Sequence, residues 1–345
     1  MNYSGVIFLL VFLIISPLAG TSQTILEKLF YYVEHPESYK SFSQHLSQVD
    51  ILAPQVFRLN RRGEIEGRVH PQILQMAKSH GIKIMPLVVN SGFDQELIHR
   101  FLQDQKAQSY AMNALLNLCQ QYGFWGIQFD FEHIPAADRD LFTAFVKATA
   151  DKLHQRGFLL SVAVFPRTGD QPLDDPYHRW YYENRSGVYD YQALAQVVDF
   201  LSIMTYDQHT GHTTPGPMAG LPWMEKVIQY VLKQAPADKV SLGIPLYSYH
   251  WFAGVIHGEG RGTGRGLSHE AAWQLLQKFR VDLQWDTDNA ISWAKFMNND
   301  IMEYLFVENA RSFTPKIKLV EKYGLRGFSA WRLGLEDPAI WKLIQ

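Results

Sequence analysis

Two acidic side chains alternate with phenylalanine in the run GIQFDFE, residues 126–132. In a β-strand, alternate side chains share one face, so Gln128, Asp130 and Glu132 project together and the two phenylalanines project oppositely. Carboxylates at this spacing, with Cα atoms about 6.5–7 Å apart, cannot both ionise freely, and one pKa is raised. A carboxyl group that keeps its proton near working pH can act as a general acid. We therefore expect acid–base chemistry here, with Glu132 as the acid; the alternative is a buried polar network that only fixes the strand.

Eight β-rich runs alternate with helical patterns after residue 23. Several are nearly continuous in apolar residues, which is typical of strands that are covered on both faces. This alternation predicts an α/β fold, an eight-stranded parallel (β/α)8 TIM barrel over residues 23–345, with a doubly wound open sheet as the structural alternative. In such a barrel, active sites lie at the C-terminal ends of the strands, where Glu132 is expected. The predicted strands are 29–34, 49–55, 82–89, 124–132, 158–166, 200–207, 240–249 and 327–334.

The gap between the seventh and eighth predicted strands is too long for a single helix. Residues 252–299 contain a Gly-rich run, a helical pattern at 269–279 and a polar stretch with tryptophan, so we expect a small α/β insertion there. Residues 301–308 are expected to add a strand before a final helix near 315–323. The Gly-rich run 260–266 lacks GxGxxG spacing and is interpreted as a flexible loop that could line a substrate cleft.

Composition excludes some classes of function. The chain has 345 residues, a net charge of −2 and 47% hydrophobic residues, which is enough apolar material for a large core and argues against disorder. Without a basic excess, a nucleic-acid partner is not expected. Aromatic residues make up 14%; most will pack the core, but they also suit a ligand with flat apolar faces, such as a sugar. Cys119 is the single cysteine and is expected to be a buried hydrophobic residue.

The N-terminus contains an apolar run of ten residues, 6–15, followed by small residues at positions 19, 20 and 22. A membrane-spanning helix needs about 20 such residues, so the run predicts a signal peptide over residues 1–22. The mature chain is then exported (secreted, periplasmic or cell-envelope associated) and has no membrane span after the signal is removed. No Lys or Arg precedes the apolar run, which leaves an uncleaved anchor as the alternative. A glycosylation sequon occupies residues 184–186.

The run 126–132 resembles the signature strand of glycoside hydrolase family 18, the chitinase family. That family places an acidic or amide residue, then Asp, then the catalytic Glu at alternate positions. The resemblance is closest to the bacterial spore-cortex-hydrolase and chitobiase-like branch, which often has Asn at the first position, where this chain has Gln128. Four more runs resemble family strands in the expected order and extend the resemblance over residues 28–345. They are SVAVFP at 161–166, MTYD at 204–207, GIPLY at 243–247 and FSAWRLG at 328–334.

The resemblance implies a retaining mechanism in which the 2-acetamido group of the substrate is the nucleophile. Glu132 would protonate the glycosidic oxygen and Asp130 would orient the acetamide group. Tyr206 would hydrogen-bond the acetamide oxygen, and Trp331 would form the floor of the sugar site. Additional candidates for substrate binding are Asp207, Gln128, Met204, Asn90 and Tyr247.

These expectations combine into a secreted, monomeric glycosidase that cleaves β-linked glycans containing N-acetylglucosamine, such as chitin oligomers or peptidoglycan. A non-catalytic glycan-binding protein on the same barrel, a chitinase-like lectin, is the alternative. A metal-dependent deacetylase is a third class, but His209 and His212 lack an HExxH pattern and a clear third ligand. No metal or cofactor is therefore expected.

Overall fold

The computed structural model describes residue 1, residues 26–252 and residues 263–345. The predicted signal peptide beyond Met1 lies outside the described residues, as do residues 260–262 of the Gly-rich run. Within the described part of the chain, no helix is long and apolar enough to cross a membrane.

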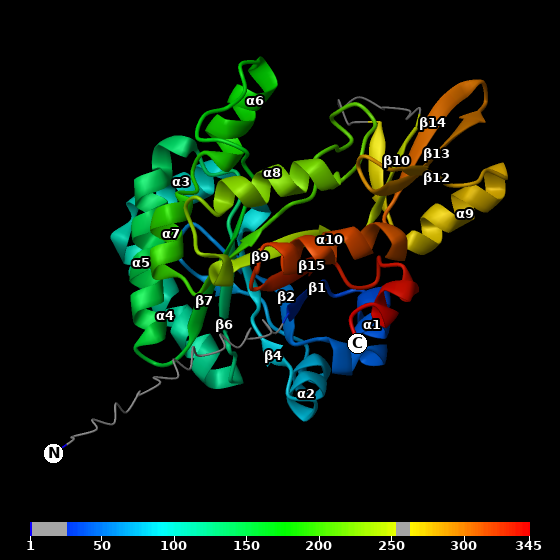
Figure 1. Cartoon of the computed structure of the whole chain (residues 1–345). Coiled ribbons are helices and arrows are strands. Elements are labelled where there is room, and N and C mark those ends of the chain that lie inside the picture. The colour runs from blue at the N-terminus through cyan, green and yellow to red at the C-terminus, as the bar shows by residue number, and fades with distance from the viewer. Residues whose placement is uncertain (2–25, 253–262) are drawn as a thin grey trace.

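Eight parallel strands form a closed barrel (Figure 1). The strand order is β1-β15-β9-β8-β7-β6-β5-β2, and β1 also pairs with β2. Because this pairing closes the sheet, the open-sheet alternative is wrong and the predicted (β/α)8 barrel is confirmed. The barrel strands are β1 (Glu27–Tyr32), β2 (Ile51–Leu59), β5 (Leu87–Asn90), β6 (Gly126–Asp130), β7 (Leu159–Val164), β8 (Phe200–Ile203), β9 (Val240–Pro245) and β15 (Gly327–Trp331).

The third predicted strand, 82–89, is divided in the structure. A two-residue strand, β4 (Lys83–Ile84), pairs with β2, and β5 resumes the pairing at Leu87. Pro86 lies between the two pieces, and a proline has no N–H to donate to a strand ladder. The short strand β3 (Ile65–Glu66) pairs antiparallel with the end of β2.

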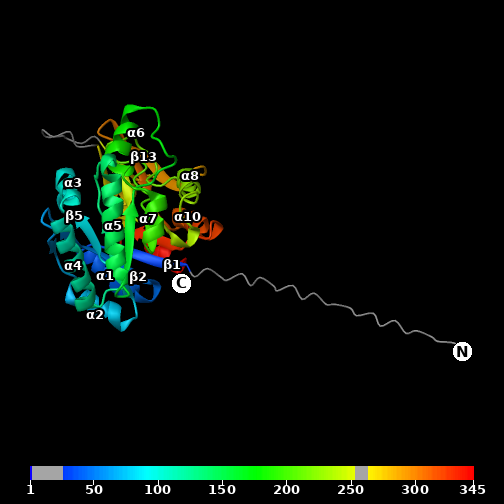
Figure 2. The same cartoon turned by 90° about the vertical axis from the view of Figure 1, so that its left-hand side faces the viewer.

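Helices cover the outside of the barrel, and Figure 2 shows α3, α4 and α5 on one side. Helices α3 and α4 each begin at an aspartate whose side chain accepts hydrogen bonds from free backbone N–H groups. For α4, Asp104 accepts hydrogen bonds from the N–H groups of residues 106 and 107, and the helix ends at Gly123 with a positive φ of 67°. The helices around the barrel are α1 (Pro36–Gln44), α2 (Pro71–Ser79), α3 (Gln95–Gln103), α4 (Gln105–Tyr122), α5 (Arg139–His154), α6 (Pro176–Tyr181), α7 (Tyr191–Val197), α8 (Leu221–Val231) and α10 (Ala310–Lys322).

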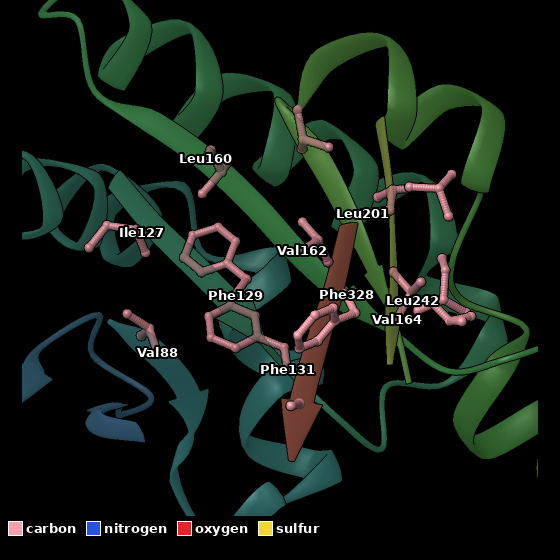
Figure 3. Close-up of a cluster of buried hydrophobic side chains, with 14 of the residues drawn as sticks. Val88, Ile127, Phe129, Phe131, Leu160, Val162, Val164, Leu201, Leu242 and Phe328 are labelled. Carbon is pink, nitrogen blue, oxygen red and sulfur yellow. The ribbon is translucent and has the colours of Figure 1, made fainter. Parts of the chain in front are cut away.

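Phe129 and Phe131, which alternate with the two acidic residues in the run 126–132, pack between the barrel wall and the helices, as the alternation predicts (Figure 3). The ring centroid of Phe129 lies 5.5 Å from that of Phe145 on α5, and Phe131 lies 6.5 Å from Phe142 on the same helix. Since these rings face outward, the alternate side chains of β6 must face the barrel interior. Cys119 is fully buried on α4, as expected, and burial raises the pKa of its thiol to about 12.

The insertion forms a separate five-stranded antiparallel sheet in the order β11-β10-β14-β13-β12. The insertion extends beyond the predicted residues 252–299 at both ends of the range, because its first strand starts at Ser248 and its last strand ends at Val307. Residues 264–266 of the Gly-rich run belong to β11, which pairs with β10, so the loop interpretation is wrong for those residues. The insertion consists of β10 (Ser248–Trp251), β11 (Gly264–Leu267), α9 (His269–Phe279), β12 (Gln284–Asp286), β13 (Ile291–Asn298) and β14 (Ile301–Val307).

The last helix, α10, starts five residues earlier than the predicted 315–323. Asn309 and Ser312 form a reciprocal capping box at its start, which satisfies the first free backbone N–H groups of the helix. Pro315 lies within the first two turns.

Candidate active site

Asp130 and Glu132 lie at the C-terminal mouth of the barrel. Asp130 is the last residue of β6 and is 4% exposed, and Glu132 follows two residues later. The side-chain amide of Gln55, on β2, donates to Asp130 Oδ2 at 3.4 Å. Asp130 Oδ1 is buried and has no hydrogen-bond partner among the described residues. One carboxylate oxygen therefore remains able to accept a hydrogen bond from a ligand.

Both carboxyl groups hold protons more tightly than usual. Burial raises the pKa of Asp130 to about 6, and the hydrogen bond from Gln55 opposes that rise. Burial and then the negative charge of Asp130 raise the pKa of Glu132 well above its ordinary value. A raised pKa suits a general acid that must remain protonated near neutral pH.

The backbone of the acid is held from two sides. Asn90, at the end of β5, accepts from the N–H of Glu132 at 2.9 Å and donates to the carbonyl oxygen of Glu132 at 3.0 Å. The hydroxyl of Tyr189 donates to the carbonyl oxygen of Phe131 at 2.7 Å. These bonds fix the chain just after β6, where it leaves the sheet.

The loop after β8 places two more site residues beside the carboxylates. Burial, together with the charges of Tyr31, Asp130, Asp207 and Glu132, raises the pKa of Tyr206 well above its usual range. Its phenol therefore stays protonated and can donate a hydrogen bond. Asp207 has a positive φ of 59° and accepts a hydrogen bond from the hydroxyl of Tyr247, which follows β9.

Aromatic and apolar side chains surround this polar centre. Trp331, at the end of β15, is partly exposed, and its ring lies 5.2 Å from the ring of Tyr31. Tyr31 is hydrogen-bonded to Ser202 Oγ at 2.8 Å inside the barrel. Met204 is buried with 6% exposure at the same mouth. Tyr31 is absent from the predicted site, although alternation along β1 could have identified it as an inward-facing residue.

Two predicted substrate-binding residues are fully buried in the structure. Gln128 is fully buried below Asp130, where its amide donates to Ser161 Oγ at 2.9 Å. Asn90 is fully buried as well, because both of its polar atoms bond to the backbone of Glu132. Asn90 thus supports the backbone of Glu132, and substrate contact by Asn90 or Gln128 stays a prediction.

Arg185 is a site residue that the sequence analysis missed. It lies in the short π-helix η4 (Tyr182–Ser186), and its positive charge lowers the pKa of Glu132 and of Asp207 against the effect of burial. Its guanidinium lies 5.5 Å from the ring centroid of Trp180. The apolar residues of this segment show no helical or strand periodicity. The sequon at 184–186 was the one feature of the segment that the sequence indicated.

The histidines near the site contact neighbouring protein groups. His133 Nε2 lies 3.9 Å from Glu132 Oε2, and burial lowers the pKa of His133. His209 Nδ1 lies 3.0 Å from the carbonyl oxygen of Thr214. Across residues 26–252 and 263–345, no group of three or more His, Cys, Asp or Glu could hold a metal ion.

The chain is similar along most of its length to a cortical fragment-lytic enzyme, to a protein described as a glycosylase and to a chitinase. It is 27% identical over 292 residues to a cortical fragment-lytic enzyme of Bacillus subtilis, covering 84% of this chain and 65% of that protein. It is 26% identical to the uncharacterized glycosylase YvbX of Bacillus subtilis, covering 89% of this chain and 87% of that protein. A crystal structure of a chitinase from Chromobacterium violaceum superposes with a TM-score of 0.83 at 27% identity, covering 92% of this chain and 98% of the chitinase.

These relatives confirm the resemblance to the bacterial spore-cortex and chitinase proteins. A family model described as glycosyl hydrolases family 18 matches residues 28–336. The chain therefore belongs to glycosyl hydrolases family 18, a family of glycosidases.

Proposed function

We propose that this protein is an exported, retaining glycosidase that acts on β-linked glycans containing N-acetylglucosamine. The observation that carries the proposal is the pair of buried carboxyl groups at the barrel mouth. Glu132 has a raised pKa suited to a general acid, and Asp130 Oδ1 is buried without a partner. An acetamide N–H is the type of donor that this oxygen lacks.

In the proposed mechanism, Glu132 donates its proton to the glycosidic oxygen as the bond to the anomeric carbon breaks. The carbonyl oxygen of the substrate's 2-acetamido group attacks that carbon and forms an oxazolinium ion. Asp130 Oδ1 accepts the acetamide N–H, and its negative charge stabilises the ion. The hydroxyl of Tyr206 donates to the acetamide oxygen. Water, deprotonated by Glu132, then opens the ring and restores the acid. Because the nucleophile belongs to the substrate, proximity lowers the barrier without an enzyme nucleophile.

The substrate class follows from this mechanism, which requires an N-acetyl group beside the scissile bond. Chitin oligomers and peptidoglycan both carry one, and the similar proteins include a chitinase and a cortical fragment-lytic enzyme. The partly exposed indole of Trp331 offers a flat apolar face for the sugar ring. We propose that the mature protein acts outside the cytoplasm as a monomer.

The decisive experiment compares Glu132→Gln with the wild type on chitohexaose and on peptidoglycan. The amide has the shape of the acid but cannot donate a proton, so we expect at least a thousandfold loss of kcat on both glycans. Glu321→Gln, at an exposed position on α10, is the matched control and should retain full activity. Wild-type turnover by the Glu132 variant would refute the assignment.

The product identifies the mechanism and separates hydrolysis from simple binding. Early NMR spectra of a chitohexaose digest should show the β-anomer, and an initial α-anomer would exclude retention. Binding of both glycans without cleavage at any pH would instead identify a lectin on the same barrel.

A further inference from the structure

A pocket of about 200 Å³ lies beside the site, between the loops that follow β7 and β8. Asp207 forms part of its wall, so the pocket adjoins the proposed sugar site. Tyr177, His178 and Tyr181 of α6 form another part, and α6 stands above the barrel in Figure 1. A water molecule occupies about 30 Å³ in the liquid, so the pocket has room for a substituent of several heavy atoms.

Arg167 lines this pocket and is an unusual buried cation. It is 9% exposed, its Nη2 donates to the carbonyl oxygen of Tyr189 at 2.8 Å, and its Nε has no partner among the described residues. None of the ion pairs formed within the described ranges includes it. A charge withdrawn from water is unfavourable unless an opposite charge or hydrogen bonds compensate for it.

Aromatic rings provide only part of that compensation. The guanidinium carbon lies 4.6 Å from the ring centroid of Tyr191, 5.7 Å from that of Tyr230 and 6.0 Å from that of Tyr182. These cation–π contacts hold the guanidinium in a fixed orientation. They do not satisfy its N–H groups, which match the geometry of a carboxylate.

We propose that this pocket binds a carboxylate-bearing substituent on the glycan, with Arg167 as its cationic partner. The inference rests on the proposed function, because the pocket and the sugar site share Asp207. It narrows the substrate class to acetylated amino sugars that carry a carboxylate on an ether-linked substituent, as the muramic acid of peptidoglycan does. Chitin is neutral and leaves Arg167 without a counter-ion.

Among the described residues that line the pocket, Asp207 is the one that carries a carboxylate. Its Oδ1 accepts the hydrogen bond of Tyr247, and burial raises its pKa. The positive charge of Arg185 lies close enough to influence Asp207 as well. Asp207 is therefore bonded to Tyr247 and forms no ion pair with Arg167 among the described residues.

The test compares kcat/KM for two tetrasaccharides without peptide, one of alternating N-acetylglucosamine and N-acetylmuramic acid and one of chitin. For the wild type, the ratio of acidic to neutral substrate should exceed 1. We expect Arg167→Gln to lower this ratio at least tenfold and Arg167→Lys to lower it less, because Lys keeps the charge but loses the planar fork. Arg179→Gln is the matched control, since Arg179 is an exposed arginine of α6 paired with Asp174. It should leave the ratio within twofold of the wild type.

A purely structural arginine would lower activity on both tetrasaccharides equally, and that outcome would overturn the proposal. A binding measurement covers the case in which the Arg167 variants do not fold. In the Glu132→Gln protein, methyl esterification of the muramic carboxyl should weaken tetrasaccharide binding at least tenfold. Equal affinity for acid and ester would also overturn it, as would inorganic phosphate that displaces the acidic and neutral sugars equally.

Failure of this inference is distinct from failure of the proposed function. Suppose that the wild-type enzyme cleaves chitin tetrasaccharide, but that the ratio of acidic to neutral substrate does not depend on Arg167. This result would refute the proposed carboxylate site and leave the proposed glycosidase activity unchanged. A wild-type protein that cleaves neither tetrasaccharide, nor chitohexaose or peptidoglycan, would refute the glycosidase itself.

Discussion

Asp130 and Glu132 both carry a pKa above the ordinary value because the barrel mouth buries them. The protonated form of such an acid stabilises the folded state, and its full contribution is present below the pKa that the group has in the unfolded chain. This contribution is lost as the pH rises through the pKa that the group has in the folded protein. For Asp130, the free energy of unfolding should therefore fall between pH 3.8 and about pH 6. At neutral pH the protein therefore carries this carboxylate at a cost in stability.

Replacing the buried acid by its amide should reverse that cost. We expect Asp130→Asn to raise the free energy of unfolding at pH 7.5 by up to about 2–3 kcal/mol, since one pKa unit corresponds to about 1.4 kcal/mol. At pH 4 the two proteins should differ little. Urea denaturation at both pH values measures the difference, and an equal gain at pH 4 would contradict the linkage.

The alkaline limb of the pH–activity profile should move in opposite directions in two variants. Arg185 lowers the pKa of Glu132, so Arg185→Gln should shift the limb of kcat/KM to higher pH. Asp130 raises that pKa, so Asp130→Asn should shift the limb to lower pH in its residual activity. Burial acts in both variants, so neither should bring the pKa of Glu132 back to its ordinary value. Arg179→Gln provides the control, and shifts of the same sign in both site variants would contradict this account.

The residues that sequence could identify were those with a regular spacing. Asp130 and Glu132 followed from the alternation of one strand, because the period of two assigns each side chain to a face. Arg167 and Arg185 come from the excursion between β7 and β8, where no period operates. Their environment depends on tyrosines and tryptophans from several elements, which no local pattern encodes.

At the level of elements, the sequence predicted all eight barrel strands but not their breaks. Pro86 divides the third strand, and β6 ends at Asp130, so Glu132 leaves the ladder and reaches the mouth. Helix α6 has six residues and was not predicted, because so short a segment shows no helical period. The insertion was placed correctly between the last two barrel strands, but its first strand merges in sequence with the apolar run of β9.

The two hydrogen bonds between Asn90, at the end of β5, and the backbone of Glu132, just after β6, give a prediction at the level of elements. Asn90→Ala removes two hydrogen bonds and leaves the N–H and C=O of Glu132 without them. We expect a loss of about 2–4 kcal/mol in the free energy of unfolding and at least a tenfold fall in kcat, with a smaller change in KM.

The readouts for this variant are urea denaturation and steady-state kinetics on chitohexaose. Asn113→Ala, at an exposed position of α4, is the matched control and should change neither value appreciably. If Asn90→Ala loses stability but keeps its kcat, Asn90 supports the fold without positioning the acid.

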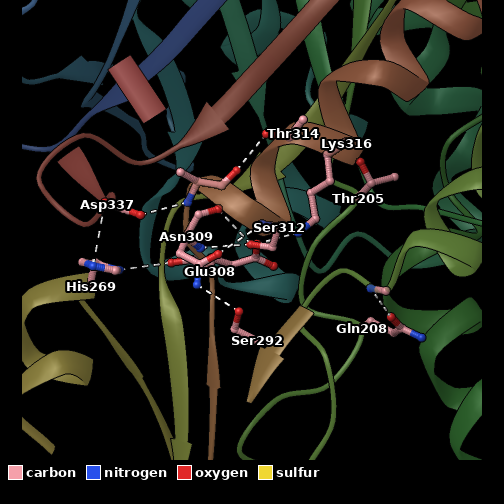
Figure 4. A network of polar contacts seen from close by, with 12 residues as sticks. Thr205, Gln208, His269, Ser292, Glu308, Asn309, Ser312, Thr314, Lys316 and Asp337 are labelled. Atoms are coloured by element: carbon pink, nitrogen blue, oxygen red, sulfur yellow. Dashed lines mark hydrogen bonds and ion pairs between the residues drawn. The ribbon is translucent and has the colours of Figure 1, made fainter. Parts of the chain in front are cut away.

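Across the whole molecule, the insertion and the barrel meet at the start of α10 (Figure 4). Asn309 donates to Ser292 Oγ on β13 at 3.0 Å, and Asp337, after β15, accepts from the N–H of Ala310 at 2.9 Å. Ser312 donates to Glu308 at 2.6 Å. The start of α10 therefore bonds both to a strand of the insertion and to the segment that follows the last barrel strand, which links the insertion to the barrel.

A buried ion pair lies at the centre of this junction. Lys316 Nζ lies 2.5 Å from Glu308 Oε2, and both side chains are nearly inaccessible to water. The sequence predicted a helix here but not a buried lysine, because the acid that pairs with it comes from the end of the insertion. Burial lowers the pKa of Lys316 and the charge of Glu308 opposes that change.

Breaking this pair from one side should be costly, because it leaves an uncompensated buried carboxylate. We expect Lys316→Met to lower the free energy of unfolding by about 3–5 kcal/mol, and the double variant with Glu308→Gln to recover a large part of that loss. The exposed pair of Lys147 and Asp151 on α5 is the control, and Lys147→Met should cost less than about 1 kcal/mol. Urea denaturation of the four proteins gives the values. A double variant no more stable than Lys316→Met would mean that lost packing, rather than the stranded charge of Glu308, accounts for the damage.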